Sequence, residues 1–174
     1  MKIALSDLKP GYYGGMPPGN WWERWLCHAE GCKTFHWMWL VRTVYEEGML
    51  VDFISSESIS KGTSITRVEN RKMMVWRIIG DPAIDADDMF DIHSNFGGSR
   101  YSWGMSIWSG VWYLAKHYFQ KVVPFIKFKG VNCLYWVDIA SLLLGYDLVP
   151  GDPEYIMQVD LENSPTLEYV GELN

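Results

Sequence analysis

The chain has 174 residues, of which 48% are hydrophobic and 16% aromatic, and this is enough apolar material for one compact domain. We therefore expect a single domain over residues 1–174. The formal net charge of -6 comes from 15 basic and 21 acidic residues without a long basic run. Because phosphate binding needs a concentrated basic face, nucleic acid is not expected as a partner.

The amino terminus and the cysteine count bear on where the protein acts. Residues 1–7 contain no long apolar stretch, so we expect neither a secretion signal nor a membrane anchor. The protein is therefore expected to be cytoplasmic as synthesised. The most apolar stretch, residues 103–119, is too short to span a bilayer, so no stable membrane insertion is expected. Three cysteines do not make a disulfide framework, and the odd count favours a reducing compartment or one thiol kept free for chemistry.

The first half of the chain predicts mostly strands. Residues 9–20 are rich in glycine and proline and predict a loop, and residues 21–26 predict a short amphipathic turn. The alternating aromatic segment 35–45 predicts a strand, followed by a hairpin turn and by further strands over 49–56 and 73–79. Three neighbouring strands favour a small antiparallel sheet.

The second half predicts helices. Asp81 is a suitable cap and Pro82 suits a first helical position, so a helix is expected over residues 82–93. Apolar residues at a spacing of three to four predict a second helix over residues 105–120. A third helix begins at Cys133, and the remainder predicts mostly loop. Strands followed by helices are typical of the α+β class.

Cys133 stands where a reactive thiol is expected. Asn132 precedes it as a cap, an apolar run continues to Leu144, and Gly145 follows, so the thiol lies in the first turn of a buried helix. The partial positive charge at a helix start stabilises a thiolate, which is the reactive form of cysteine. Cys133 is therefore the candidate nucleophile.

Partners for this thiol are available on the predicted strands. His36 lies on the first strand and can remove the thiol proton, while Glu57, at the end of the second, can accept a hydrogen bond from the other ring nitrogen. The thiolate would then attack a carbonyl and form an acyl-enzyme. The backbone amide of Cys133 and the hydroxyl of Tyr101 are candidate donors to the oxyanion. If the strand register is shifted, other residues replace Glu57: Ser55, Ser56 or Asp52.

Short motifs follow one another along nearly the whole chain: Asp7-Leu8-Lys9-Pro10-Gly11, the strand at His36, Glu57 followed by Gly62, Val75-Trp76-Arg77, Tyr101-Ser102-Trp103, Asn132-Cys133 and Asp152-Pro153. In this order they resemble the circularly permuted branch of the NlpC-type papain-like cysteine peptidases, which has peptidase, amidase and acyltransferase members. The resemblance implies a papain-like α+β fold with a small antiparallel sheet packed against helices. It implies Cys133 as nucleophile, His36 as base, Glu57 as the orienting group and Tyr101 near the oxyanion. No cofactor is expected.

Three departures from the family pattern concern the substrate groove. Tyr12 stands where the family has an aspartate after Gly11, and the insertion between Gly11 and His36 is long and aromatic. The histidine strand, with Trp37-Met38-Trp39, is bulkier than that of the family. The expected function is a cysteine hydrolase that cleaves an amide bond, and the resemblance makes a peptidoglycan peptide or a similar cell-wall amide the leading substrate. Without an export signal, the protein would reach a cell wall by lysis or injection, as in a phage or toxin-like role.

Other readings of the same residues stay open. A thioesterase or acyltransferase would use the same thiol on an acyl substrate, with the surplus of aromatic residues around the acyl chain. A binding module without turnover would use the tryptophan-rich residues 21–39 as its contact surface.

A zinc site competes with this chemistry for His36. Cys27, His28, Cys32 and His36 are four potential ligands, but the spacing is compact for one tetrahedral ion and no second Cys-x-x-Cys pair supports it, so no metal is expected. If zinc were bound there, His36 would not be free to act as the base. A disulfide between Cys27 and Cys32 is a further alternative to free thiols.

Overall fold

The fold is taken from a computed structural model, which describes residues 1–59, 61–68, 71–96, 98–120, 124, 126, 128–151 and 156–174. The motif Asp152-Pro153 lies outside the described residues.

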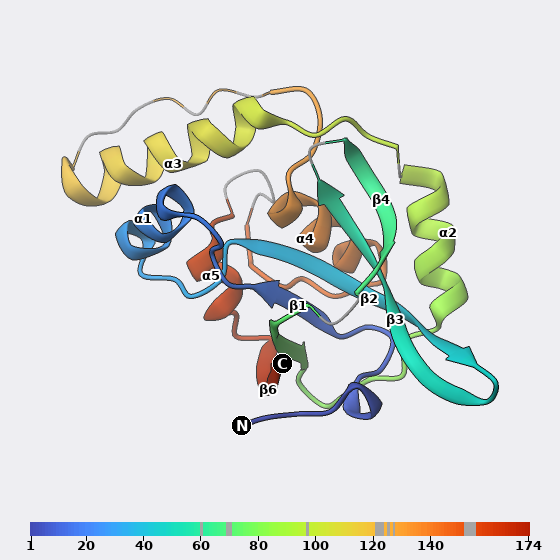
Figure 1. The fold of residues 1–174 in the computed structure, drawn as a ribbon. Coiled ribbons are helices and arrows are strands. Elements are labelled where there is room, and N and C mark those ends of the chain that lie inside the picture. The colour runs from blue at the N-terminus through green and yellow to red at the C-terminus, as the bar shows by residue number, and fades with distance from the viewer. Residues whose placement is uncertain are drawn as a thin grey trace.

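In the described residues, six strands form one sheet in which each strand runs antiparallel to its neighbours, in the order β4-β3-β2-β1-β5-β6 (Figure 1). The strands are β1 (Tyr13–Met16), β2 (His36–Glu46), β3 (Met49–Ile59), β4 (Gly62–Arg67), β5 (Met73–Ile78) and β6 (Leu167–Leu173).

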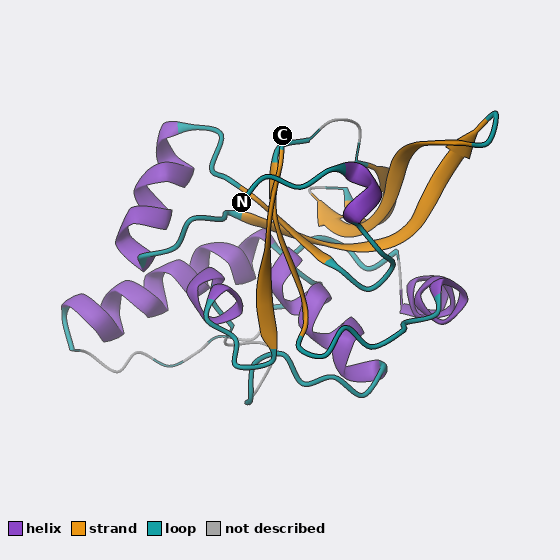
Figure 2. Cartoon of the chain, turned by 90° about the horizontal axis from the view of Figure 1, so that it is seen from below, coloured by secondary structure: helices purple, strands orange, loops and turns teal. Residues whose placement is uncertain are grey.

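The helices are α1 (Trp21–Glu30), α2 (Ala86–Phe96), α3 (Trp103–Tyr118), α4 (Cys133–Leu143) and α5 (Gln158–Glu162), with a short 3-10 turn at Leu5–Asp7. Helix α4 packs against β2 and β3, and α2 contacts both α4 and β2 (Figures 1 and 2). Helix α3 contacts α1 at the other end of the molecule. The combination of helices and an antiparallel sheet confirms the α+β class.

The alternation of side chains predicted for β2 is confirmed, because successive residues of this strand belong to two different core clusters. Trp37, Trp39 and Val41 are fully buried in one cluster, which also contains Cys133 and other residues of α4. Met38 and Leu40 are fully buried in a second cluster on the opposite face of the sheet. Because successive side chains of a strand point to opposite faces, both sides of β2 are covered.

Strand β1 lies in the segment predicted as a loop, and it changes the sheet order. It pairs with β2 through Tyr13 and Trp39 and with β5 through Tyr13 and Trp76. Its two glycines allow close packing, since a Cβ at Gly14 would stand 2.7 Å from a sulfur and one at Gly15 would stand 2.6 Å from a methyl group. The strand predicted over residues 73–79, which is β5, is therefore separated from β3 by β2 and β1.

The helix predicted to start at Pro82 begins at Ala86 instead. Asp81 does not act as its cap, because its φ is 47° and its carboxylate pairs with Lys9. Helix α1 replaces the short turn predicted over residues 21–26. It starts at a capping box in which the Asn20 side chain accepts from the Glu23 backbone, and it continues to Glu30.

Besides β1, the sequence does not predict β4, β6 or α5. Strand β6 forms the edge of the sheet beside β5, in part of the chain where mostly loop is predicted. Strand β4 forms the other edge, beside β3, and it brings polar side chains to the candidate site described below.

Candidate active site

Cys133 is the first residue of α4, as predicted. The Asn132 side chain caps the helix by accepting a hydrogen bond from the Tyr135 backbone at 2.8 Å. The thiol residue is 6% exposed and belongs to the cluster between the sheet and α4. The positive end of the helix dipole stabilises the thiolate form of a cysteine at this position.

The segment before the helix is held in place by the segment before α3. Val131 accepts a hydrogen bond from the Ser102 backbone at 2.9 Å, and its own N–H donates to the Arg100 carbonyl at 3.0 Å. Gly130 has a φ of 105°, and a Cβ there would stand 2.3 Å from the Arg100 oxygen. Only glycine fits this approach without displacement, so the start of α4 has a defined position.

His36 and Glu57 meet across the hairpin formed by β2 and β3. The register pairs Met38 with Glu57, which places the glutamate two residues along from His36 on the neighbouring strand. The His36 Nε2 lies 2.7 Å from the Glu57 Oε2, and the glutamate side chain is 1% exposed. The pairing predicted between these two residues is therefore present in the structure.

The second carboxylate oxygen of Glu57 also has partners. The Thr66 hydroxyl donates to Oε1, and the Arg71 Nη1 donates to the same oxygen at 2.8 Å. Both residues reach Glu57 from the chain beyond β3, Thr66 on β4 and Arg71 just before β5. Nothing in the sequence pattern singles them out, because an arginine carries no signal that links it to a carboxylate fourteen residues earlier.

The alternatives to Glu57 have other contacts. The Ser55 hydroxyl faces Thr66 at 3.2 Å, and the Ser56 hydroxyl lies 2.8 Å from the His93 ring and accepts from the Trp136 indole at 2.9 Å. The Asp52 carboxylate accepts from the Phe53 backbone. Of the four candidates for the third residue, the structure brings Glu57 to His36.

Cys133 and His36 shift each other's pKa in opposite directions. Burial alone would raise the pKa of the Cys133 thiol, but the hydrogen bond and the charge of His36 outweigh it, and the pKa is lowered. Burial alone would lower the pKa of His36, but hydrogen bonds to Cys133 and Glu57 raise it to about 10. Since the thiol pKa falls and the imidazole pKa rises, the site favours a thiolate beside an imidazolium.

Glu57 is ionised in the same network. Burial opposes its charge, but hydrogen bonds from His36, Thr66 and Arg71 lower its pKa to about 2. Glu57 therefore carries a negative charge between two positively charged groups, the His36 imidazolium and the Arg71 guanidinium. The backbone N–H groups of Trp37 and Leu134 also stabilise the thiolate.

Tyr101 lies close enough to Cys133 for the two to influence each other. Burial raises the pKa of the Tyr101 hydroxyl to about 12, and the charge of Cys133 contributes to this rise. The hydroxyl lies 3.0 Å from the Ser106 hydroxyl, so the phenol remains a neutral hydrogen-bonding group near the sulfur.

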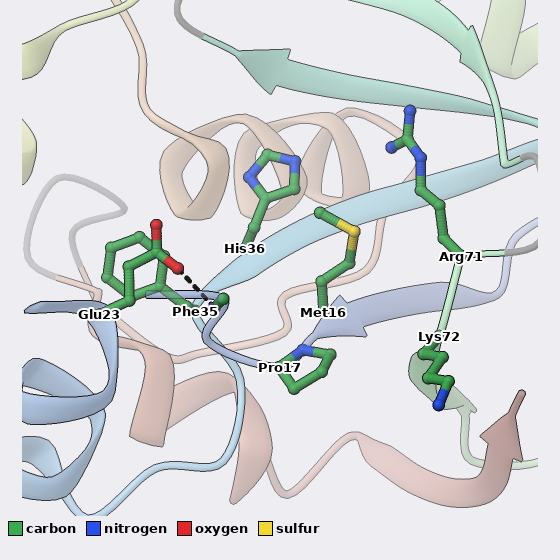
Figure 3. A pocket seen from close by; sticks show the side chains of 8 residues that line it. Met16, Pro17, Glu23, Phe35, His36, Arg71 and Lys72 are labelled. Atoms are coloured by element: carbon green, nitrogen blue, oxygen red, sulfur yellow. Dashed lines mark hydrogen bonds between the residues drawn. The ribbon is translucent and has the colours of Figure 1, made fainter. Parts of the chain in front are cut away.

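A pocket of about 390 Å³ opens beside His36 (Figure 3). In this view His36 lies between Glu23 and Phe35 on one side and Arg71 and Lys72 on the other. A pocket of this size is in the range that small ligands occupy, and it gives the imidazole contact with a space where a substrate can lie.

Of the four potential zinc ligands, Cys27 and Cys32 have different contacts from His36. The Cys27 and Cys32 thiols both donate to the Thr34 carbonyl, at 3.2 and 3.4 Å, and all three cysteines are free. His36 instead lies with Glu57 and Cys133. Within the ranges given above, no three His, Cys, Asp or Glu side chains come together as metal ligands.

The tryptophan-rich segment is divided between surface and core. Trp21, Trp22 and Trp25 on α1 are exposed, and the rings of Trp22 and Trp25 stack with centroids 5.1 Å apart. Trp37 and Trp39 on β2 are fully buried. A contact surface over residues 21–39 is therefore wrong for its second half, because β2 is a central strand of the sheet.

Among the described residues, no helix is both long and apolar enough to cross a membrane. No protein-family model matches the chain, and no curated protein matches it. The NlpC-type resemblance, with its papain-like topology, stays a prediction.

Proposed function

We propose that the protein is a cysteine hydrolase that cleaves an amide bond through an acyl-enzyme on Cys133. The observation that carries this proposal is the connected arrangement of a thiol at a helix start, an imidazole that lowers the thiol pKa, and a buried carboxylate 2.7 Å from that imidazole. Nucleophilic catalysis by a thiol requires a nucleophile, a base and a group that orients the base. Here α4, β2 and β3 each contribute one of these groups.

The reaction follows from the protonation states. The Cys133 thiolate attacks the carbonyl carbon, a carbon–sulfur bond forms, and negative charge develops on the carbonyl oxygen. The His36 imidazolium gives its proton to the departing amine as the carbon–nitrogen bond breaks, leaving a thioester. Water then attacks this thioester, His36 takes the proton from the water, and the carbon–sulfur bond breaks to release the acid and the thiolate.

Glu57 and Tyr101 assist without bonding to the substrate carbon. Glu57 holds the Nε2 side of the ring, so Nδ1 is the nitrogen left to face the sulfur, and its charge stabilises the imidazolium. The backbone amide at the start of α4 and the Tyr101 hydroxyl are the proposed donors to the oxyanion. The proposed substrate is a peptide of the cell wall, reached from the cytoplasm by lysis or injection.

A thioesterase or acyltransferase is the second candidate, and the apolar residues of the pocket favour it. Met16, Pro17 and Phe35 would accommodate an acyl chain beside His36. The two candidates share the acyl-enzyme and differ in the leaving group.

The proposal is tested by trapping the acyl-enzyme. After brief exposure to p-nitrophenyl acetate, we expect an acetyl group on Cys133 in peptide mass maps, and no acetylation at this position in Cys133→Ser. Turnover of a peptide amide and of an alkyl thioester is then compared. Wild-type protein that never acquires the acetyl group at Cys133 would contradict both candidates.

A further inference from the structure

The pocket beside His36 has an unequal distribution of charge. We propose that it binds a carboxylate of the substrate on the side formed by Arg71 and Lys72, with an apolar part of the same substrate against Met16 and Phe35. The inference rests on the proposed function and deepens it, because the proposed base His36 is one of the residues that line this pocket.

The apolar part of the pocket comes from β1 and the start of β2. Met16 ends β1, Pro17 follows it, and Phe35 precedes His36, so these three side chains line the space next to the imidazole (Figure 3). A group lying there loses contact with water, which favours a hydrocarbon stretch in the substrate.

The negative charge on the opposite side of the pocket is already engaged. The Glu23 carboxylate accepts hydrogen bonds from the Gly19 backbone at 2.6 Å and from the Asn20 side chain at 2.7 Å, as part of the cap of α1. This cap fixes the carboxylate at the start of α1, where the positive end of the helix dipole offsets its charge. We therefore place the recognition of a charged substrate group on the other side of the pocket, at Arg71 and Lys72.

Two cations define that other side. The Arg71 side chain is 29% exposed and pairs with Glu57, whose carboxylate is buried away from solvent. Within the described ranges no carboxylate lies within 4 Å of the Lys72 ammonium, and Lys72 is an exposed residue on a flexible stem. Arg71 and Lys72 both line the pocket on this side, with side chains that diverge from consecutive positions (Figure 3). Each cation attracts a carboxylate from its own position, since each donates charge-assisted hydrogen bonds to carboxylate oxygens.

The test uses thiol-directed probes that differ in one group. Chloroacetamides with an alkyl chain of one to five methylenes, ending in either a carboxylate or a carboxamide, alkylate Cys133 by displacement of chloride from carbon. Rate constants are read from mass maps of the Cys133 peptide and divided by those for free cysteine. Lys72→Met removes the positive charge and keeps a side chain of similar length. Lys72→Glu reverses the charge. Lys116→Met on α3 is the control, because this lysine lies over the Trp112 ring on a different element.

We expect the carboxylate probe of the best length to react about three times faster than its carboxamide, which is the scale of one partly exposed ion pair. Lys72→Met should abolish this preference, Lys72→Glu should reverse it, and Lys116→Met should leave it unchanged. High salt should reduce it in the wild type because the site is open to solvent. Equal rates for acid and amide at every length, or a preference that survives Lys72→Met, would overturn the assignment.

A direct binding measurement separates this inference from the proposed function. Hexanoate and hexanamide are titrated into wild-type, Lys72→Met and Lys116→Met proteins and followed by NMR. Tighter binding of hexanoate that is lost only in Lys72→Met supports the carboxylate site even if Cys133 reacts no faster than free cysteine, a result that would contradict the hydrolase alone. Equal binding of the two ligands would overturn the carboxylate site whether or not Cys133 is reactive.

Discussion

His36 and Glu57 lie on neighbouring antiparallel strands with Nε2 and Oε2 2.7 Å apart, and the glutamate is 1% exposed. A carboxylate so deeply buried is ionised only because its partners replace the water it has lost. Its hydrogen bonds to His36, Thr66 and Arg71 fulfil that role. The same contacts hold the imidazole in place beside Cys133, so stability and chemistry depend on one network.

Glu57→Gln should lower the free energy of unfolding at neutral pH by about 3 kcal/mol, the lower end of the cost of breaking a buried ion pair. The folded pKa of Glu57 is about 2 and lies below its ordinary value of 4.5. The contribution of its charge is therefore present above about pH 4.5 and is lost as the pH falls toward 2. Urea unfolding of both proteins between pH 7 and pH 3 checks this, and a difference that does not shrink in acid would count against the ionised carboxylate.

Arg71→Gln should move the acid limb of the Cys133 alkylation rate to higher pH. Without the guanidinium, the pKa of Glu57 rises and the carboxylate is protonated earlier as the pH falls. Arg71→Lys should restore part of the original profile. Arg67→Gln is the matched control, because Arg67 pairs with the exposed Glu46 and not with the site. A uniform loss of rate at every pH would indicate that Arg71 has a structural role only.

Tyr101→Phe should slow acylation by p-nitrophenyl acetate about 100-fold, the effect of removing one donor to an oxyanion. The hydroxyl lies near the charge of Cys133 and is held by Ser106, so its loss should leave the fold intact. The burst rate of p-nitrophenolate measures the effect, with Tyr45→Phe at an exposed position as the control. A burst as fast as that of the control would show that Tyr101 only fills space.

Gly130→Ala should destabilise the protein more than Gly145→Ala. Both glycines have positive φ, 105° and 89°, and the conformational strain of an alanine is about 1–2 kcal/mol at each. At Gly130 the new Cβ also meets the Arg100 carbonyl at 2.3 Å, whereas at Gly145 nothing lies within 4 Å. Thermal unfolding compares the two variants, and equal losses of stability would show that the approach to Arg100 does not constrain the start of α4.

Much of the fold is predictable where the pattern is local. The alternation of large apolar residues identifies β2, and the Asn132 cap with its apolar run identifies α4. Strand β1 is different, because the sequence Tyr-Gly-Gly-Met is extended only through its hydrogen bonds to β2 and β5. Tertiary contacts decide the conformation of such a segment, and local propensity does not reveal them.

The residues of the candidate site also fall into those that a local sequence pattern predicts and those that depend on tertiary contacts. Cys133 is predictable because a helix start is a local feature, and Glu57 follows from the hairpin that aligns it with Met38. Thr66 and Arg71 depend on how β4 folds back on β3, for which the sequence offers no periodic signal. Helix α2 begins later than the sequence predicts, and Asp81, the predicted cap, has a φ of 47° and pairs with Lys9 in the folded chain.

The rate of alkylation of Cys133 by iodoacetamide tests the central claim most directly, because only the thiolate reacts. The account predicts that Cys133 in the wild type reacts faster at pH 6 to 7 than the thiol of free cysteine. It also predicts that His36→Ala loses this advantage, since the imidazole is what lowers the thiol pKa. Equal rates at Cys133 in the wild type and in His36→Ala would contradict a thiolate maintained by His36.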